Sequence, residues 1–548
     1  MVKTDVLYYG DNLDILRRYI PEASVDLVYL DPPFNSNRDY NVIFKDESGR
    51  KSDAQLLAFE DTWHWGPSAE ATYSYLTNTA RHEGRVPSTV STIVAALRAG
   101  IGENQMMAYL IEMAVRLVEL HRVLKPTGSL YLHCDPTASH YLKLVLDGIF
   151  DVRNFRNEIS WKRFSAKNDP KRYGRNHDVI LFYSKGSTIT WHPQYGPFEE
   201  DYVAENYRYV EPGSGRRYRL SDLTANKAGG DVDYEWHGML PYKGRHWAFS
   251  RDNLDKFLAE GRIVFRRTGM PVYKRYLDEM PGVPQQDIWT DIRLQAGSKE
   301  RLGWDTQKPL ALLERIVSAS SNPGDIVLDP FCGCGTALVA AQKLDRRWIG
   351  IDITYLSIAV MRARLKDSFG LDDVEVIGQP TEVEGARQLA ASPDGRYQFQ
   401  WWALNLVDAK PLGGVEKKGA DRGIDGLITF TDLNRELHSV LVSVKSGHVN
   451  SAMVRDLKGT LEREKGSIGL FITLEEPSRE MRLEADTAGI FHSELWKRDY
   501  PRIQILSIRD LLEEGMKPHL PPFVLSTYQE AERIVTKQAA EQAELFGS

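Results

Sequence analysis

The chain has 548 residues, of which 42% are hydrophobic and 26% are charged, and its formal net charge is −7. A chain of this length exceeds what one core usually organises, so we expect about two to four domains. Its 3 cysteines are too few for a disulfide framework, and it has neither an apolar run that could span a bilayer nor an N-terminal signal pattern. We therefore expect a cytoplasmic protein without a membrane partner.

The N-terminal third alternates between predicted strands and helices. Apolar residues predict strands at 6–9 and 25–30, joined by a helix on which Leu13, Leu16 and Ile20 share one face. A long helix at 104–123 leads to a strand at 129–133. This rhythm predicts a parallel sheet with right-handed crossovers, and hence an α/β fold.

Residues 188–295 break that rhythm and are rich in Tyr, Arg, Gly and Pro, so we expect an inserted module there. Regularity returns with a helix at 310–318, a strand at 326–328, a helix ending near 344 and a strand at 348–351. We expect the first domain to cover 1–378, a linker 379–396, a second α/β domain 397–520, and a tail helix 521–548.

A glycine-rich turn follows the predicted strand at 326–328. Gly333 and Gly335 allow a ligand to approach the backbone, and the next helix offers unpaired N–H groups. Asp352, which ends the following strand, lies 23 positions after Asp329 (352 − 329), as in Rossmann-like nucleotide sites. The alternative is a tight structural turn with Cys332 and Cys334 as small fillers.

A second motif, Asp31-Pro32-Pro33-Phe34, ends the strand at 25–30, where open α/β sheets bind ligands. The prolines remove two N–H donors, so a carboxylate and carbonyls remain as acceptors for an amino group, and Phe34 offers a stacking face. This arrangement suits methylation of an exocyclic amine at a methyl sulfonium. The alternative is a rigid turn.

The two motifs together resemble those of the S-adenosylmethionine-dependent DNA amino-methyltransferases. The catalytic motif precedes the cofactor motif, as in the beta group, so the resemblance implies a Rossmann-like class I methyltransferase with circularly permuted motif order and the insert as target-recognition module. It implies that Asp31, Pro32, Pro33 and Phe34 meet a flipped-out base in double-stranded DNA. It also implies a set of residues around S-adenosyl-L-methionine: Asp329, Phe331, Gly333, Gly335, Asp352, Lys308 near the cofactor carboxylate, and Asp11 near the adenine. Gln379 is a rival for the position of Asp11.

Asp in the first motif position is typical of adenine-N6 methylation in this family, and cytosine-N4 methylation is the alternative. Two segments, 153–175 and 262–276, combine cations with aromatic rings and suit DNA contacts. Asn176, His177 and Asp178 are expected at the rim of the pocket. Sequence choice is expected to fall to arginines of the insert, namely Arg216, Arg217, Arg219, Arg266 and Arg267.

In the second domain, a predicted hairpin brings Asp425 and Lys445 to one edge, where an acid and a lysine can bind Mg²⁺ and activate water. The pattern resembles Mrr-like restriction endonucleases, but Ser443 stands where that family has an acidic residue or Gln. The alternatives are therefore a combined restriction–modification protein and a DNA-binding or decayed domain. The chain could also be a DNA-binding protein with a silent pocket.

The last residues, Gln542-Ala543-Glu544-Leu545-Phe546, resemble the peptide that docks bacterial proteins on the sliding clamp, with Gln542, Leu545 and Phe546 as contacts. An ordinary amphipathic helix end is the alternative. A homodimer is a further hypothesis.

Overall fold

The computed structural model describes residues 2–33, 64–166, 169–226, 233–295, 297–304, 306–391, 395–412, 424–433, 436–522 and 531–534. It also gives the backbone of the antiparallel hairpin formed by β3 (Asp39–Lys45) and β4 (Lys51–Glu60). The chain divides into two compact units, one formed by 1–192 with 287–548 and the other by 193–286.

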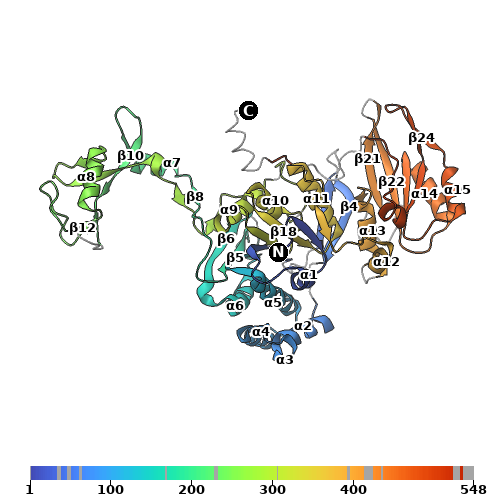
Figure 1. Ribbon diagram of the computed structural model, residues 1–548, viewed down its shortest axis with the longest axis horizontal. Coiled ribbons are helices and arrows are strands. Elements are labelled where there is room, and N and C mark those ends of the chain that lie inside the picture. The colour runs from blue at the N-terminus through green and yellow to red at the C-terminus, as the bar shows by residue number, and fades with distance from the viewer. Residues whose placement is uncertain are drawn as a thin grey trace. The chain divides into compact units, whose positions relative to one another are not determined.

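A nine-stranded sheet organises the first unit (Figure 1). Its strands, in spatial order, are β16 (Ile288–Trp289), β6 (Phe155–Lys162), β7 (His177–Ser184), β5 (Leu124–Cys134), β2 (Val25–Leu30), β17 (Ile326–Asp329), β18 (Arg347–Asp352), β1 (Val6–Tyr9) and β19 (Glu375–Ile377). The strands from β5 to β19 are parallel, whereas β7 is antiparallel to both β5 and β6. The predicted α/β class is confirmed, and the circular permutation stays a prediction.

Helices cover both faces of this sheet, because its strands alternate apolar residues between the two sides. The helices α1 (Asn12–Tyr19), α5 (Gln105–Val123) and α6 (Ser139–Phe150) share one core with β2 and β5, and α2 (Pro67–Thr77), α3 (Thr79–His82) and α4 (Ser88–Ile101) lie beside them. On the other face are α9 (Leu310–Ser320), α10 (Thr336–Lys343) and α11 (Tyr355–Phe369).

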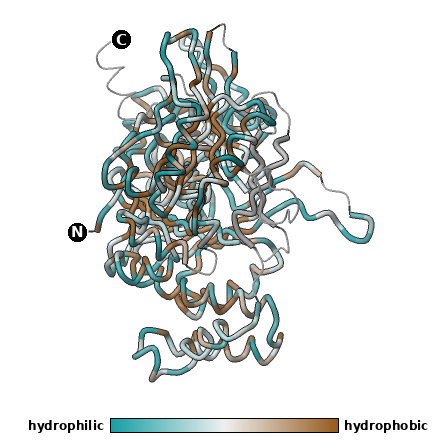
Figure 2. Tube along the Cα trace, turned by 90° about the vertical axis from the view of Figure 1, so that its right-hand side faces the viewer, coloured by the Kyte–Doolittle hydropathy of each residue, from teal (hydrophilic) through white to brown (hydrophobic). Residues whose placement is uncertain are grey.

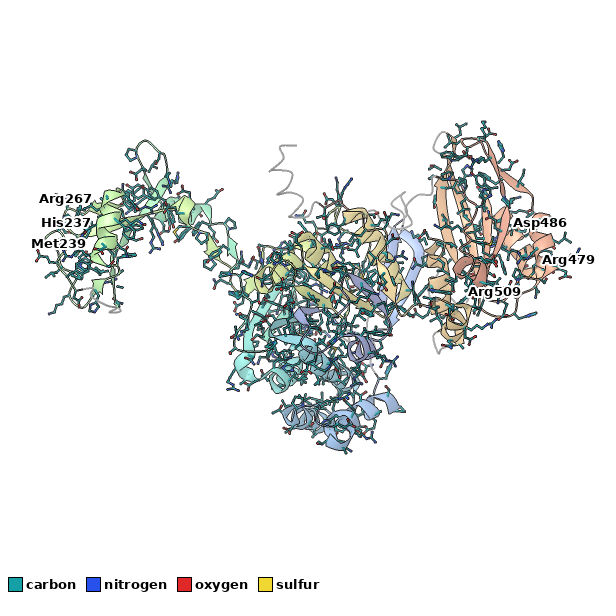
Figure 3. All side chains as sticks on the ribbon, in the orientation of Figure 1. His237, Met239, Arg267, Arg479, Asp486 and Arg509 are labelled. Carbon is teal, nitrogen blue, oxygen red and sulfur yellow. The ribbon has the colours of Figure 1, made fainter. Side chains whose placement is uncertain are left out.

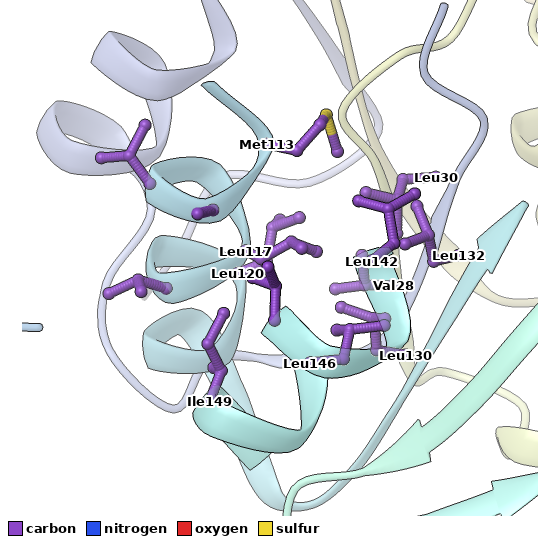
Figure 4. Packing of buried hydrophobic residues seen from close by; sticks show 14 of the residues in the cluster. Val28, Leu30, Met113, Leu117, Leu120, Leu130, Leu132, Leu142, Leu146 and Ile149 are labelled. Carbon is purple, nitrogen blue, oxygen red and sulfur yellow. The ribbon is translucent and has the colours of Figure 1, made fainter. Parts of the chain in front are cut away.

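The first core is built almost entirely from aliphatic side chains (Figure 4). Leu117 and Leu120 of α5 and Leu142 and Leu146 of α6 surround residues of β2 and β5 such as Leu130. The tube view agrees, since its apolar stretches gather in the interior and its polar stretches at the periphery (Figure 2). Among the described residues, no helix is both long and apolar enough to cross a membrane.

One strand is longer than the sequence predicts. We predicted a strand that begins at residue 129, yet β5 begins at Leu124, which pairs with Val25 ahead of a register shift between Val25 and Leu27. The irregularity accommodates Pro126, which cannot donate to a regular ladder.

The second unit, 193–286, lies within the stretch whose periodicity is weak. Its largest sheet joins β13 (Ile263–Phe265), β14 (Pro271–Tyr276), β10 (Arg217–Asp222) and β9 (Tyr209–Val210). These strands are short, which explains why they leave little period in the sequence. With α8 (Arg251–Ala259) and the loops they enclose a small core of Leu223, Trp236, Trp247, Leu254, Ile263 and Met270.

The C-terminal part of the first unit forms a five-stranded sheet of β20 (Lys410–Pro411), β21 (Gly426–Thr431), β22 (Leu437–Lys445), β23 (Ile468–Thr473) and β26 (Ile503–Ser507). The helices around it are α13 (Gly395–Asn405), α14 (Ser451–Arg463), α15 (Arg479–Asp486) and α16 (Ile508–Leu512), and β24 (Ile490–Ser493) pairs with β25 (Arg498–Pro501). The hairpin of β21 and β22 is antiparallel, as expected. A helix, α12 (Val383–Ala391), occupies much of the predicted linker.

Leu130→Ala should lower the free energy of unfolding of the chain by about 2–5 kcal/mol, because it removes buried methyl groups and leaves a cavity. Leu144→Ala is the matched control, since Leu144 on α6 is 47% exposed whereas Leu130 is fully buried. The control should stay within about 0.5 kcal/mol of the parent. Urea titrations followed by tryptophan fluorescence compare the two, and equal effects would contradict the assignment of Leu130 to the core.

Candidate functional site

Three carboxylates meet at one edge of the large sheet. Asp329 and Asp352 end β17 and β18, and Asp31 directly follows β2, which pairs with β17. Burial raises the pKa of Asp329 to about 8, and the charges of Asp31 and Asp352 act in the same direction. Burial likewise raises the pKa of Asp352. Protein interiors rarely hold such a group without a ligand or a cation nearby.

The glycine-rich turn lies between Asp329 and Asp352 and is tied to both. The backbone N–H of Phe331 donates to Asp329 Oδ1 at 3.0 Å, and that of Gly333 donates to Asp352 Oδ2 at 2.9 Å. Gly333 and Gly335 have φ values of +53° and +75°, a region that other residues rarely adopt. A Cβ at Gly335 would also lie 2.8 Å from Cγ of Met361. Only glycine therefore fits this turn.

Asp31 is paired on one side and unsatisfied on the other. Lys308, which is 7% exposed, forms an ion pair with Asp31 Oδ2. In contrast, Asp31 Oδ1 is buried and has no hydrogen-bond partner among the described residues. Pro32 is buried and Pro33 half-buried beside it, whereas Phe34 lies outside the described residues. The site thus presents an unused acceptor at the sheet edge.

Asp11 lies at the same edge, at the start of α1. Its Oδ1 caps the helix by accepting the N–H of Leu13 at 2.7 Å, and its Oδ2 pairs with Arg116 at 2.9 Å. The strand before it, β1, lies between β18 and β19. Asp11 therefore follows the strand adjacent to β18, whereas its rival Gln379 follows the outer strand β19.

A buried polar chain lies beside Asp31. Asp178 belongs to it and is buried, although we expected it at the rim of the pocket, and we did not predict Tyr29 and His133 from the sequence. His133 follows Leu132, the β5 partner of Leu30, and so lies next to Asp31. Tyr29 Oη lies 3.0 Å from His133 Nδ1, and His133 Nε2 lies 2.9 Å from Asp178 Oδ2. Burial and the charge of Lys308 lower the pKa of His133. The sequence could have indicated this chain, because the ends of β5 and β2 and the start of β7 lie at the same edge of the sheet. Recognising it would have required knowing that β7 is antiparallel to β5.

The cysteines behave as fillers. The described structure buries Cys332 and Cys334 at opposite ends of the turn, both as free thiols. Burial raises the pKa of both thiols, so neither is prepared to act as a thiolate.

The arginines predicted to read DNA lie in the second unit, and several have internal partners. Arg216 pairs with Asp278 at 2.7 Å, and Arg266 lies 3.4 Å from Asp222. Arg219 donates to the hydroxyl of Tyr202 at 3.1 Å. Arg217 and Arg267 are exposed, and Arg267 lies with His237 and Met239 at one end of the unit (Figure 3). Arg266 is exposed as well, so Arg217 and Arg267 differ from the other three in having no side-chain hydrogen bond or ion pair among the described residues.

Asp425 and Lys445 do meet in the C-terminal sheet, with Lys445 Nζ 3.5 Å from Asp425 Oδ2. The same carboxylate accepts the N–H of Val444 at 2.6 Å and an amide N–H of Gln400 at 3.0 Å, and Ser443 Oγ lies 3.4 Å away. Across the described residues, no group of three His, Cys, Asp or Glu side chains could hold a metal ion. The proposed clamp contacts, Gln542, Leu545 and Phe546, lie outside the described residues.

Residues 25–360, which include Asp31, Lys308 and the glycine-rich turn but not Asp11, match the model of a family described as DNA methylase, which covers N6 and N4 enzymes. The chain belongs to this DNA methylase family. Residues 412–513 also match a family described as NACHT-associated inactive restriction endonuclease 1, which agrees with the expected likeness of the C-terminal domain.

Among the relatives of this methylase chain is the type II methyltransferase M.EcaI of Enterobacter cloacae, with 37% identity over 249 residues, 45% of this chain and 54% of the relative. The DNA adenine methyltransferase YhdJ of Escherichia coli is 23% identical over 377 residues, 67% of this chain and 85% of the relative. TTHA0409 of Thermus thermophilus, solved with S-adenosyl-L-methionine, is 17% identical over 69% of this chain and 99% of its own, with a TM-score of 0.32. The chain spans only about half the length of M.EcaI (54%).

The buried carboxyl of Asp329 should make the unfolding free energy depend on pH. Its pKa is about 8 in the folded chain, against about 3.9 when unfolded, so the folded state holds more protons between these values. Stability from this group is present at low pH and is lost as pH rises from about 4 to about 8. Asp329→Asn should therefore flatten the decline measured by urea unfolding from pH 5 to pH 9. Parallel curves for parent and variant would contradict this assignment.

Proposed function

We propose that this protein transfers a methyl group from S-adenosylmethionine to the N6 amino group of a flipped-out adenine in double-stranded DNA. The observation that carries the proposal is the buried, unpartnered Asp31 Oδ1, which lies at the sheet edge beside the glycine-rich turn. The family supports the reaction type, and the adenine methyltransferase YhdJ supports the choice of base.

The donors and acceptors around the turn fit S-adenosylmethionine. Gly333 and Gly335 leave the turn without side chains at these two positions, and the first N–H groups of α10 follow it directly. Asp352 would accept hydroxyls of the ribose, Asp11 would meet the adenine, and Lys308 would meet the cofactor carboxylate, with Asp329 and Phe331 lining the methionine end. When bound, the cofactor supplies an electrophilic methyl group.

Asp31 and Pro32 would prepare the amine for attack. Asp31 Oδ1 and the carbonyl of Pro32 each accept one N–H of the amino group, which raises the electron density on nitrogen. After transfer the nitrogen carries one proton too many, and Asp31 Oδ1 is the acceptor beside it. Pro33 offers no N–H that would compete for these acceptors, and Phe34 would stack on the base.

The target amine is hidden in a duplex, so the base must leave the stack at a cost of a few kcal/mol. Stacking on Phe34 returns about 1–3 kcal/mol of this. Arg217 and Arg267 are our candidates for base-edge contacts, because they are exposed and can form bidentate hydrogen bonds to guanine. Cytosine-N4 methylation is the alternative reaction, since the same acceptors suit that amine.

The decisive experiment expresses the parent and Asp31→Ala in a host without methyltransferases and maps modified bases by single-molecule sequencing. The parent should produce N6-methyladenine at one defined motif. Asp31→Ala should lower methylation at least about a hundredfold, because it removes the acceptor at the reacting nitrogen. N4-methylcytosine would overturn the base assignment alone. An unmodified genome with folded parent protein would overturn the proposed activity.

We further propose that the C-terminal domain does not cleave DNA. Asp425 Oδ2 is already engaged by the N–H of Val444, and Ser443 provides no second carboxylate, so a hard cation would find too few oxygen ligands. The likeness to a family described as inactive supports this proposal.

Incubation of the full chain with Mg²⁺ and plasmid DNA, methylated or unmethylated, should leave the plasmid uncut. The Lys445→Ala variant should behave like the parent, because the lysine has no metal-bound water to assist. Mg²⁺-dependent cutting that disappears in Lys445→Ala would instead establish a combined restriction–modification protein.

A further inference from the structure

The loop between β6 and β7, at the sheet edge where Asp31 lies, carries an exposed aromatic ring. Tyr173 is 99% exposed, and no contact of its ring or hydroxyl with another described residue is recorded. A fully exposed ring offers both of its faces for stacking on another planar group. The described residues around it, Lys171, Arg172 and Arg175, are exposed cations.

The loop is closed at its base and tied to the candidate site. Its neck follows β6 and precedes β7, where the N–H of Arg163 donates to the carbonyl of Asn176 at 2.8 Å. Arg163 also pairs with Asp178 at 3.2 Å, and Asp178 contacts His133 beside Asp31. The described part, 169–175, therefore projects from the edge at which Asp31 lies.

Three further contacts hold the chain on either side of Tyr173. Asp169 accepts the N–H of Lys171 at 3.1 Å and pairs with Arg172 at 2.9 Å, which forms a compact turn just before the ring. After the ring, Arg175 donates to Thr137 Oγ1 at 2.9 Å in the turn that follows β5. Tyr173 is thus held between two anchored points while its ring remains outside.

We propose that Tyr173 enters the DNA duplex next to the target base and stacks in the gap that the flipped adenine leaves. This inference rests on the proposed function and adds a residue to it. A flipped base leaves a gap about one base step high, about 3.4 Å, which a planar ring can fill. Lys171, Arg172 and Arg175 supply the positive charge that holds phosphates on either side. Phe34 would then stack on the extruded base, and Tyr173 on the bases left behind.

The test uses the duplex that the methylation map defines in two versions. One carries 2-aminopurine, which fluoresces when unstacked, at the target position and reports the flipped fraction. The other keeps adenine there and gives kcat/KM, because 2-aminopurine has no N6 amino group. Tyr173→Ala should lower the flipped fraction and kcat/KM about five- to a hundredfold, the range expected for loss of one base–aromatic stack. Tyr173→Phe keeps the ring and should restore both. Phe164→Ala is the matched control, because Phe164 is the other exposed ring of the loop but lies at its neck, under the guanidinium of Arg163 at 5.1 Å.

A second substrate separates gap filling from a merely structural role. A mismatch at the target lowers the cost of unstacking, so the defect of Tyr173→Ala should largely disappear on a mismatched duplex. A Tyr173→Ala variant equal to the parent on the matched duplex, or equally defective on both duplexes, overturns the inference and leaves the proposed function standing. A parent protein that neither methylates nor flips any duplex overturns both.

Discussion

The burial of negative charge at one sheet edge is the constraint on which the rest of the molecule depends. Parallel strands β2, β17 and β18 end together, and each delivers a carboxylate to the same place. Burial raises the pKa of both Asp329 and Asp352, and for Asp329 the charges of Asp31 and Asp352 add to the effect. Lys308 partly offsets the charge by pairing with Asp31.

The same buried site also fixes the protonation and the hydrogen-bond partners of the neighbouring His133. His133 lies between Tyr29 and Asp178, and burial together with Lys308 keeps its pKa low. A neutral imidazole can accept a hydrogen bond from Tyr29 Oη and donate one to Asp178, so both its ring nitrogens are satisfied. The chain continues to Arg163, at the neck of the loop that carries Tyr173. The interior of the site and its outer loop are therefore one connected polar structure.

Much of the large sheet could be predicted from the sequence, because its strands are short apolar runs that end at chemically distinctive residues. The predicted strands at 6–9 and 25–30 match β1 and β2 residue for residue. The order of the strands in the sheet was harder to predict, since β2 lies between β5 and β17, and β17 is about 300 residues away in the sequence. The pairing of Lys308 with Asp31 was not predicted either, because it depends on where the segment before α9 crosses the sheet edge.

In the second unit and the C-terminal domain, local patterns carried less information. Strands of two to six residues in 193–286 leave no period to detect, and partners such as Asp278 for Arg216 only become visible when β10 and β14 lie side by side. The hairpin that brings Asp425 to Lys445 was predictable from two apolar strands. The hydrogen bonds that Asp425 accepts could not be predicted in the same way, because one donor, Gln400, comes from α13, outside that hairpin.

The position of β1 has a consequence for how the chain is made. Residues 6–9 are synthesised long before their strand partners, because among the described residues β1 pairs with β18 and β19, which follow more than 330 positions later. Until then β1 has no strand partner, and β2 lacks one of its two neighbours. A sheet with such distant strand partners completes its pairing late, and its apolar strand edges stay exposed until then. Nascent chains of this protein should therefore depend on chaperones until residue 377 has emerged, long after the segment Asp31-Pro32-Pro33-Phe34 has been made.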